Sequence, residues 1–486
     1  MRRTLYLLFS CLLAPALTFA QGDTPWTLQR AVDYALENNL QVKRLNNLTE
    51  ISRINETQAR NARLPSVSAS TNVGAQLGRT IDPTTNEFNQ QTIGFQGYNL
   101  QANVILYNGG SIKNQLAQSS IDLAAAELDA KVTGNNIALQ VANSYLNIVL
   151  FREQLKNARA QLTLIEEQLA NTDALIRAGS LPPAQRFDFL AQQAASQRTI
   201  VELENQERMA ILGLQILLEL PTSEPFNVTV PDLDVAEAQL LESYDPEEVY
   251  QSARGVQPTV LAAELRRASA EAGIEVAKSG LRPTVSLFGS LSTNYSTVAK
   301  DFSNPDVIRE PEFEFGLARP VQINGQEALL ANLEATGGEV DFPSIGYLNQ
   351  LDRNFGQSVG LALNVPIFNQ GRNRLNVQRA EIVRRNADVD IQQSENQLRN
   401  DVQLALANLR AAQEGYRAAR VSQDAAEAAY TAAQQRFRAG AANSLDLVTA
   451  QNRYEQAQTE FVRSKYQLLF NRQVIRFYLG QGFSLN

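Results

Sequence analysis

Apolar and small residues recur every three and four positions through the second half of a stretch that runs from Arg372 to Ala439. The stretch has 68 residues, no proline and one interior glycine. This spacing is typical of a helix whose seam faces a partner helix, and its repeat of about 3.5 residues predicts a left-handed supercoil. At about 1.5 Å per residue the helix would be roughly 100 Å long, which no ordinary globular core needs. The seam comprises Val402, Ala405, Leu409, Ala412, Tyr416, Ala419, Gln423, Ala426, Tyr430, Ala433 and Phe437.

The same seam occurs 261 positions earlier, between Val141 and Ile176. Two flanking markers, Asn-x-Gly before the helix and Arg-Ala-Gly after it, move by the same offset. Farther upstream, the Pro65 region resembles the Pro283 region at an offset of 218, so the second copy carries 43 extra residues. Any two alanine-rich helices look somewhat alike, but a constant offset between anchors indicates a tandem internal repeat.

Outside the long helices the period of the pattern changes from 3.6 to 2. Apolar residues alternate with small polar residues in four stretches, each about ten residues long, as expected of tilted strands that cross a bilayer. A half-buried soluble sheet gives the same alternation, so one strand alone would not decide between the two. The predicted strands cover about 66–78, 93–107, 284–296 and 356–368.

Four strands are too few to close a barrel, and an open sheet cannot lie in lipid with unpaired edges. If the strands are in a membrane, several chains must therefore pool them. Three chains would supply twelve strands, an even number that encloses a water-filled lumen. The residues require pooling, although they do not by themselves give the number three.

The pattern divides the chain into two repeats, 21–220 and 244–486, joined by a linker at 221–243. An entry helix, with Thr27 available as N-cap and a break near Asn38-Asn39, runs to about Arg63 before the first strand. Each repeat ends in a helical hairpin that turns at a glycine, where a left-handed residue is favoured. The predicted hairpin helices cover about 111–178, 184–220, 372–439 and 444–480, and 297–354 is interpreted as a long external loop.

Residues 1–20 have the composition of a secretory signal peptide, with Arg2 and Arg3 before an apolar run and a small-residue cleavage site at Ala20. Cys11 leaves lipidation as an alternative to a place within that signal. No apolar run of 18 residues follows, so no transmembrane helix is expected.

The rest of the chain contains no cysteine and no histidine, which excludes disulfides, thiolate catalysis and histidine acid–base chemistry. The formal net charge of the whole chain is −8, which argues against nucleic acid as a partner. We therefore expect neither an enzyme, nor a cofactor, nor a metal site.

The order and spacing of these elements, together with the string from Phe437 to Gln451, resemble the TolC-type outer-membrane factor family. The resemblance implies a mixed α/β membrane protein, a homotrimer with a twelve-stranded barrel in outer-membrane lipid and a helical tunnel in the periplasm. It also implies an exit duct for efflux or type I secretion, served by a periplasmic adaptor protein and an inner-membrane transporter. The alternative is a surface structural or adhesive protein with a helical stalk. The sequence does not identify a cargo.

The resemblance further implies particular site residues. In relatives with an aspartate gate, an acid stands six residues after the tip glycine, which here is Asp446; the second acid of that gate is replaced by Thr449. These two residues are the candidates for a pore constriction, although any acid in a first helical turn is favoured by the helix dipole. The candidates for adaptor contact at the hairpin tips are Arg177, Gly179, Arg438, Gly440 and Ser444.

Two sets of residues leave alternatives open. Arg177 and Arg438 either contact an adaptor, or cap a helix C-terminus, or do both. Aromatic residues near the strand ends either form an interfacial girdle or pack within the sheet. The second set is Phe95, Tyr107, Tyr295 and Phe368.

Overall fold

The computed structural model describes residues 25–81, 88–90, 92–230, 240, 242–310, 312–316, 318–330, 333–336 and 339–481. The expected signal peptide with Cys11, and residues 231–239 and 241 of the expected linker, lie outside this part of the chain. The protein divides into two compact units. A helical unit takes the described parts of Met1–Asn55, Gln118–Ala270 and Ile382–Asn486, and a strand unit takes those of Glu56–Ala117 and Glu271–Glu381.

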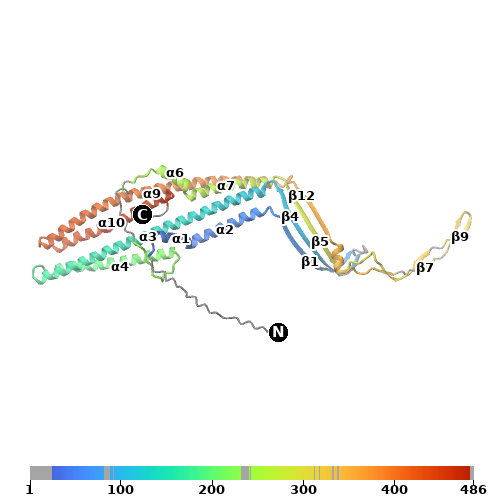
Figure 1. The fold of residues 1–486 in the computed structure, drawn as a ribbon, viewed down its shortest axis with the longest axis horizontal. Helices are drawn as coiled ribbons and strands as arrows, with labels where there is room; N and C mark the ends of the chain where they lie inside the picture. Colours follow the sequence, from blue (N-terminus) through green and yellow to red (C-terminus); the bar gives the residue numbers. More distant parts are fainter. Residues whose placement is uncertain are drawn as a thin grey trace, which may run out of the picture. The chain divides into compact units, whose positions relative to one another are not determined.

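Each repeat has a short helix, a second helix that leads into the sheet, and a hairpin of two long helices (Figure 1). The four hairpin helices begin and end within three residues of their expected bounds. The first repeat contains α1 (Leu28–Asn38), α2 (Leu40–Asn61), α3 (Ser111–Arg177) and α4 (Gln185–Leu217). The second repeat contains α6 (Pro246–Val256), α7 (Pro258–Ser279), α9 (Arg372–Arg438) and α10 (Ser444–Tyr478).

The break in the entry helix falls at Asn39, as the sequence predicts. Thr27 is the N-cap of α1, and its hydroxyl accepts a hydrogen bond from the Arg30 backbone N–H at 3.3 Å. At the break, the Asn39 carboxamide accepts from the Gln41 backbone N–H at 2.9 Å and donates to the Leu217 carbonyl at 3.0 Å. The amide thus starts α2 and closes the C-terminal end of α4.

The second repeat has an equivalent side-chain amide 218 residues later, at Gln257. Gln257 separates α6 from α7, and its side-chain nitrogen donates to the Phe477 carbonyl at 3.0 Å at the end of α10. Both amide side chains are buried, and each gives a hydrogen-bond partner to a carbonyl near a helix end.

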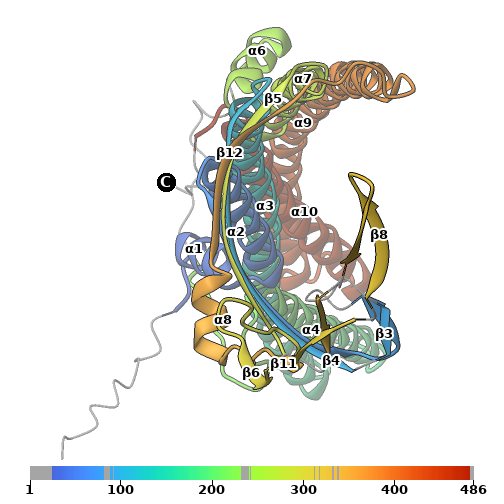
Figure 2. The ribbon, with the colours of Figure 1, turned by 90° about the vertical axis from the view of Figure 1, so that its right-hand side faces the viewer.

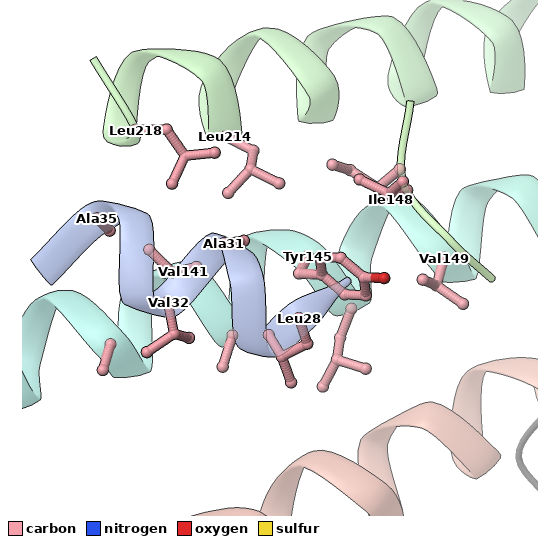
Figure 3. Close-up of a cluster of buried hydrophobic side chains, with 14 of the residues drawn as sticks. Leu28, Ala31, Val32, Ala35, Val141, Tyr145, Ile148, Val149, Leu214 and Leu218 are labelled. Atoms are coloured by element: carbon pink, nitrogen blue, oxygen red, sulfur yellow. The ribbon is translucent and has the colours of Figure 1, made fainter. Parts of the chain in front are cut away.

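The core of the helical unit is likewise duplicated. In the first repeat, apolar residues of α1 and the middle of α3 pack with the end of α4 (Figure 3). The hydroxyl of Tyr145 lies there, 2.6 Å from the Thr229 carbonyl oxygen and 3.0 Å from that of Trp26. In the second repeat, α6, α9 and α10 form the matching cluster. The α9 seam residues Val402, Ala405, Leu409, Ala412, Tyr416, Ala419 and Tyr430 are buried, as the heptad pattern predicts.

The strand unit contains one curved four-stranded antiparallel sheet in the order β1-β4-β5-β12 (Figure 2). Its register places most apolar residues of the four strands on one face and most small polar residues on the other, with Phe95 and Phe288 as exceptions on the polar face. On the apolar face, Val67 lies opposite Ala102, and Val359 lies opposite Gly289. The strands are β1 (Ser66–Gln76), β4 (Ile93–Asn108), β5 (Thr284–Ser296) and β12 (Gly356–Asn364).

The expected bounds of the fourth strand are too long by four residues. β12 ends at Asn364, two residues before Pro366. Pro366 has no backbone N–H to donate to a ladder, so the pairing does not continue to Phe368.

The interpretation of 297–354 as a loop is incomplete. Among its described residues are short paired strands and one helix, α8 (Tyr347–Arg353). The strand pairs are β6 (Asp306–Arg309) with β11 (Glu339–Asp341), β7 (Glu312–Phe315) with β10 (Leu333–Thr336), and β8 (Arg319–Ile323) with β9 (Gln326–Leu330). A smaller hairpin of β2 (Arg79–Ile81) and β3 (Phe88–Gln90) lies between β1 and β4.

Candidate functional site

The two hairpin tips end their long helices in the same way. After α3, the N–H of Gly179 donates to the Ile176 carbonyl, and the N–H of Ser180 donates to the Leu175 carbonyl. After α9, Gly440 and Ala441 make the equivalent bonds, and the two glycines have φ of +72° and +73°. This is the Schellman geometry, in which a left-handed residue lets backbone donors satisfy the last carbonyls of the helix.

The return helix of the second tip begins at Asn443. Its side-chain oxygen accepts from the backbone N–H of Asp446 at 2.7 Å, so Asp446 occupies the first turn of α10. The carboxylate of Asp446 and the hydroxyl of Thr449 are both on exposed residues. A negative charge at this position is favoured by the N-terminal end of the helix dipole whatever else it does.

Ser444 differs from the other expected tip residues. It is only 2% exposed, and its hydroxyl donates to the Asp188 carboxylate of α4 at 2.6 Å. Ser444 therefore joins the two tips of one chain, and its contact with an adaptor stays a prediction. Arg177, Gly179, Arg438 and Gly440 are all exposed.

Asp188 was not among the expected site residues, although the repeat offset could have found it. Adding 261 to its number gives 449, so the first repeat has an acid where the second repeat has Thr449. Each return helix therefore carries one acid in its first turn. When the two repeats are aligned at the offset of 261, these acids are three residues apart, which is about one helical turn.

Farther from the tips, the two hairpins face each other through amides and hydroxyls. The Gln168 side-chain nitrogen of α3 donates to the Tyr430 hydroxyl of α9 at 2.9 Å. The Gln192 side-chain nitrogen of α4 donates to the Asn452 side-chain oxygen of α10 at 2.6 Å. Bonds of this kind are individually modest, about 0.5–1.5 kcal/mol. A buried apolar cluster of Phe189, Tyr430 and Leu447 also joins the two hairpins.

One acid lies within this polar interface. Glu455 of α10 lines a cavity of about 430 Å³ between α3, α4 and α10. Burial raises the pKa of its carboxyl group, and the amides of Gln161 and Gln451 oppose that rise by hydrogen bonding to the charged form. The other polar residues of this cavity include Gln154, Asn157, Gln192, Ser196, Asn452 and Gln458.

The aromatic residues near the strand ends divide between the two expected alternatives. The register puts Phe95 on the polar face of the sheet opposite Gly74, and its ring occupies the space that a side chain at Gly74 would need. Tyr295 lies on the apolar face, and its ring centroid is 4.9 Å from that of Tyr347. Phe95 therefore packs within the sheet, whereas Tyr295 belongs to a cluster at one end of the apolar face.

None of the helices that the structure describes is both long enough and apolar enough to span a bilayer. Helical hairpins that end in matched tips, joined in each repeat to two strands with one apolar and one polar face, define the class of outer-membrane channel proteins. A family model described as outer membrane efflux protein matches residues 31–218 and 347–481. The chain belongs to this family, so the expected TolC-type resemblance is confirmed.

The chain is similar to several named proteins. It is 26% identical over 207 residues to the pyoverdine export outer membrane protein OpmQ of Pseudomonas putida, a match that spans 43% of this chain and 43% of that relative's length. It is 21% identical over 463 residues to the outer membrane efflux protein BepC of Brucella suis, covering 94% of this chain and 86% of that one.

The solved structure of CusC has the same fold. Its TM-score with this chain is 0.70 at 18% sequence identity, and the alignment covers 94% of this chain and 92% of CusC. Together with the family match, this places the protein in the outer membrane, with its helical part in the periplasm.

Proposed function

We propose that the protein is the outer-membrane exit duct of a tripartite efflux or type I secretion system, a passive channel with no chemistry of its own. The observation that carries this proposal is the two-faced sheet, whose polar face suits a water-filled lumen and whose exposed apolar face suits lipid. Membership of the efflux protein family supports it further and gives no support to an adhesive stalk.

The proposed assembly is a homotrimer with a twelve-stranded barrel. β1 and β12 are the end strands of the sheet, so each would pair with the other end strand of a neighbouring copy. The helices next to these strands support the same arrangement, because both carry exposed apolar residues. On α9, Leu375, Ile382 and Val389 recur at heptad spacing, and on α2 the exposed residues include Leu48 and Ile51.

The proposed partners are a periplasmic adaptor protein, which would dock on the hairpin tips, and an inner-membrane transporter that drives export. The exposed candidates for adaptor contact are Arg177, Gly179, Arg438 and Gly440. Each arginine lies in the last turn of its helix, where its positive charge also interacts favourably with the negative end of the helix dipole.

The proposed constriction is a ring of Asp446 carboxylates at the tunnel end, one from each copy, with Thr449 beside each. Asp188 would add a second set of acids from α4, although its bond to Ser444 directs it toward the neighbouring tip. Like charges in a narrow opening attract counter-ions, so the duct should prefer cations.

Two measurements test this function. The native mass in mild detergent, corrected for bound detergent, should equal about three chains, and the purified protein should conduct ions across a planar bilayer. A monomer that does not conduct would overturn the proposal. Asp446→Asn should reduce the preference for cations. If the ion selectivity of Asp446→Asn is unchanged, the proposed carboxylate ring is wrong, whereas the proposed duct still stands.

A further inference from the structure

The seven-residue helix α8 is attached to β5 by several side-chain hydrogen bonds. Gln350, which is 2% exposed, accepts from the Ser296 backbone N–H at 2.9 Å and donates to the Ser296 carbonyl at 2.9 Å. It thereby pairs with the last residue of β5 as a neighbouring strand would. The Thr293 hydroxyl donates to the Leu351 carbonyl at 2.7 Å, and the Asn354 side-chain nitrogen donates to the Asn294 carbonyl at 2.8 Å.

These bonds hold α8 against the apolar face of the sheet. Thr293 and Tyr98 are paired in the register and belong to the same face as Val67 and Val359. Figure 2 accordingly has α8 on the convex side of the curved sheet. Toward the opposite end of the strands, the same face exposes Val67, Val359, Leu361 and Leu363.

A cluster of tyrosine hydroxyls marks the edge of this apolar face. The Tyr98 and Tyr347 hydroxyl oxygens are 2.8 Å apart, and the Tyr347 hydroxyl donates to the Gln96 side-chain oxygen at 3.2 Å. The rings of Tyr295 and Tyr347 pack together. Tyrosines with an apolar ring and a bonded hydroxyl are typical of the level at which hydrocarbon gives way to headgroups.

The exposed residues of α8 include Leu348 together with the polar residues Asn349, Asp352 and Arg353. Leu348 is 75% exposed and Phe355, directly after the helix, is 53% exposed, whereas Asp352 lies exposed between them. A contiguous exposed apolar surface, rather than a single exposed residue, marks a site of membrane or partner interaction. A carboxylate between Leu348 and Phe355 is too costly for the hydrocarbon core but is tolerated at the headgroup boundary.

We propose that α8 is an interfacial anchor that inserts Leu348 and Phe355 into the headgroup boundary of the outer leaflet. The occupant of this surface is the bilayer itself, because the surface continues the exposed apolar face of β1, β5 and β12 at the level of the tyrosine cluster. The inference rests on the proposed function, since it requires the sheet to lie in the membrane.

The experiment uses single-tryptophan variants of the full chain in vesicles with brominated phospholipids. The chain has one tryptophan, Trp26, so Trp26→Phe supplies the background. Leu348→Trp reports on α8, and Val359→Trp reports on the middle of the apolar face. Leu329→Trp in β9 is the matched control, because Leu329 is 73% exposed in the chain, close to the value for Leu348.

The expected result is that Leu348→Trp is quenched most by bromine near the headgroup end of the acyl chain. Val359→Trp should be quenched most by bromine near the chain terminus, and Leu329→Trp should be quenched by neither. If Leu348→Trp behaves like Leu329→Trp while Val359→Trp is quenched, the anchor is wrong and the barrel stands. If Val359→Trp is not quenched either, the membrane sheet and the proposed function fail together.

Discussion

Gly440 has a left-handed backbone conformation, which is unfavourable for most other residues. A side chain at this position would nevertheless contact no other part of the chain. Its φ is +73°, and no heavy atom of the chain lies within 4 Å of the place where its Cβ would be. Gly179 is alike in both respects. The outer side of each tip is therefore free of intrachain contacts. A side chain placed there would interfere only with a molecule that binds from outside the chain.

Gly440→Asp tests this bare surface. The left-handed backbone should cost about 1–2 kcal/mol in the tip, which is too little to unfold helices of this length. We expect efflux to be lost, measured as drug or dye accumulation in cells, while the native mass and the outer-membrane insertion stay unchanged. Gly440→Asn is the control, because asparagine tolerates positive φ and adds no charge. Collapse of the assembly in Gly440→Asp would make the glycine purely structural.

Glu455 should make stability depend on pH. Burial raises the pKa of its carboxyl group above the ordinary value of 4.5. Between the ordinary pKa and the raised pKa, the folded chain keeps a proton on Glu455 that the unfolded chain has released. The contribution of Glu455 to stability therefore falls as the pH rises through this window.

Glu455→Gln removes the titrating group and keeps the shape of the side chain. The Tm of the variant, followed by the helical circular dichroism signal, should exceed that of the wild type at pH 8, and the difference should disappear at pH 4. Glu460→Gln, an exposed acid on the same helix, should show no such crossing. A Glu455→Gln variant that is no more stable at pH 8 than the wild type would contradict the burial argument.

At the scale of elements, Asn39 and Gln257 each connect the start of an entry helix to the end of a return helix by a side-chain hydrogen bond. Asn39→Ala leaves the Leu217 carbonyl without its side-chain donor and removes the cap of α2. We expect a loss of about 1–3 kcal/mol in the free energy of unfolding by urea. Gln257→Ala should lose a similar amount, because it removes the equivalent bonds to the end of α10.

A comparison of these two variants checks the duplication itself. If only one of them loses stability, the two repeats do not use the amide in the same way. Variants at Asn38 should change the free energy of unfolding by less, because its bonds to the Tyr34 carbonyl and from the exposed Lys43 ammonium do not reach a return helix.

The elements were predictable where a local period carries them. The heptad of α9, the alternation of β1 and the break at Asn39 each follow from residues adjacent in the sequence. The strand pairs in 297–354 were missed, although Asn324-Gly325 is a hairpin signal and Glu312 to Phe315 alternates. Their strands have only three to five residues, so no window of usual length detects them.

The candidate site was less predictable than the fold. The glycine turns could be predicted because their conformation selects their residue type. The burial of Ser444 could not, since it depends on Asp188, 256 positions away in another helix. A sequence pattern reports which face of one helix is apolar, whereas a polar contact between two hairpins depends on how both of them pack.

At the scale of the whole molecule, the exposed apolar stripe of α9 should hold neighbouring copies together. Ile382→Lys places a charge in the middle of that stripe, between Leu375 and Val389. The native mass in mild detergent should fall from about three chains to one, because a buried unpaired ammonium is costly. The helical circular dichroism of the chain should be retained.

Leu404→Lys is the control for this variant. Leu404 is an exposed apolar residue of the same helix that does not fall at the heptad positions of the stripe. It should keep the native mass of the wild type. A trimer that survives Ile382→Lys would mean that the strands alone hold the copies together.

The end strands of the sheet also have a consequence for how quickly the protein reaches the membrane. A chain that cannot satisfy the edges of β1 and β12 by itself has no stable place in lipid until other copies arrive. Insertion is then a reaction of higher order in chain concentration. Halving the rate of synthesis should therefore lower the number of finished ducts by more than half, and the excess would wait in the periplasm as substrate for chaperones and proteases.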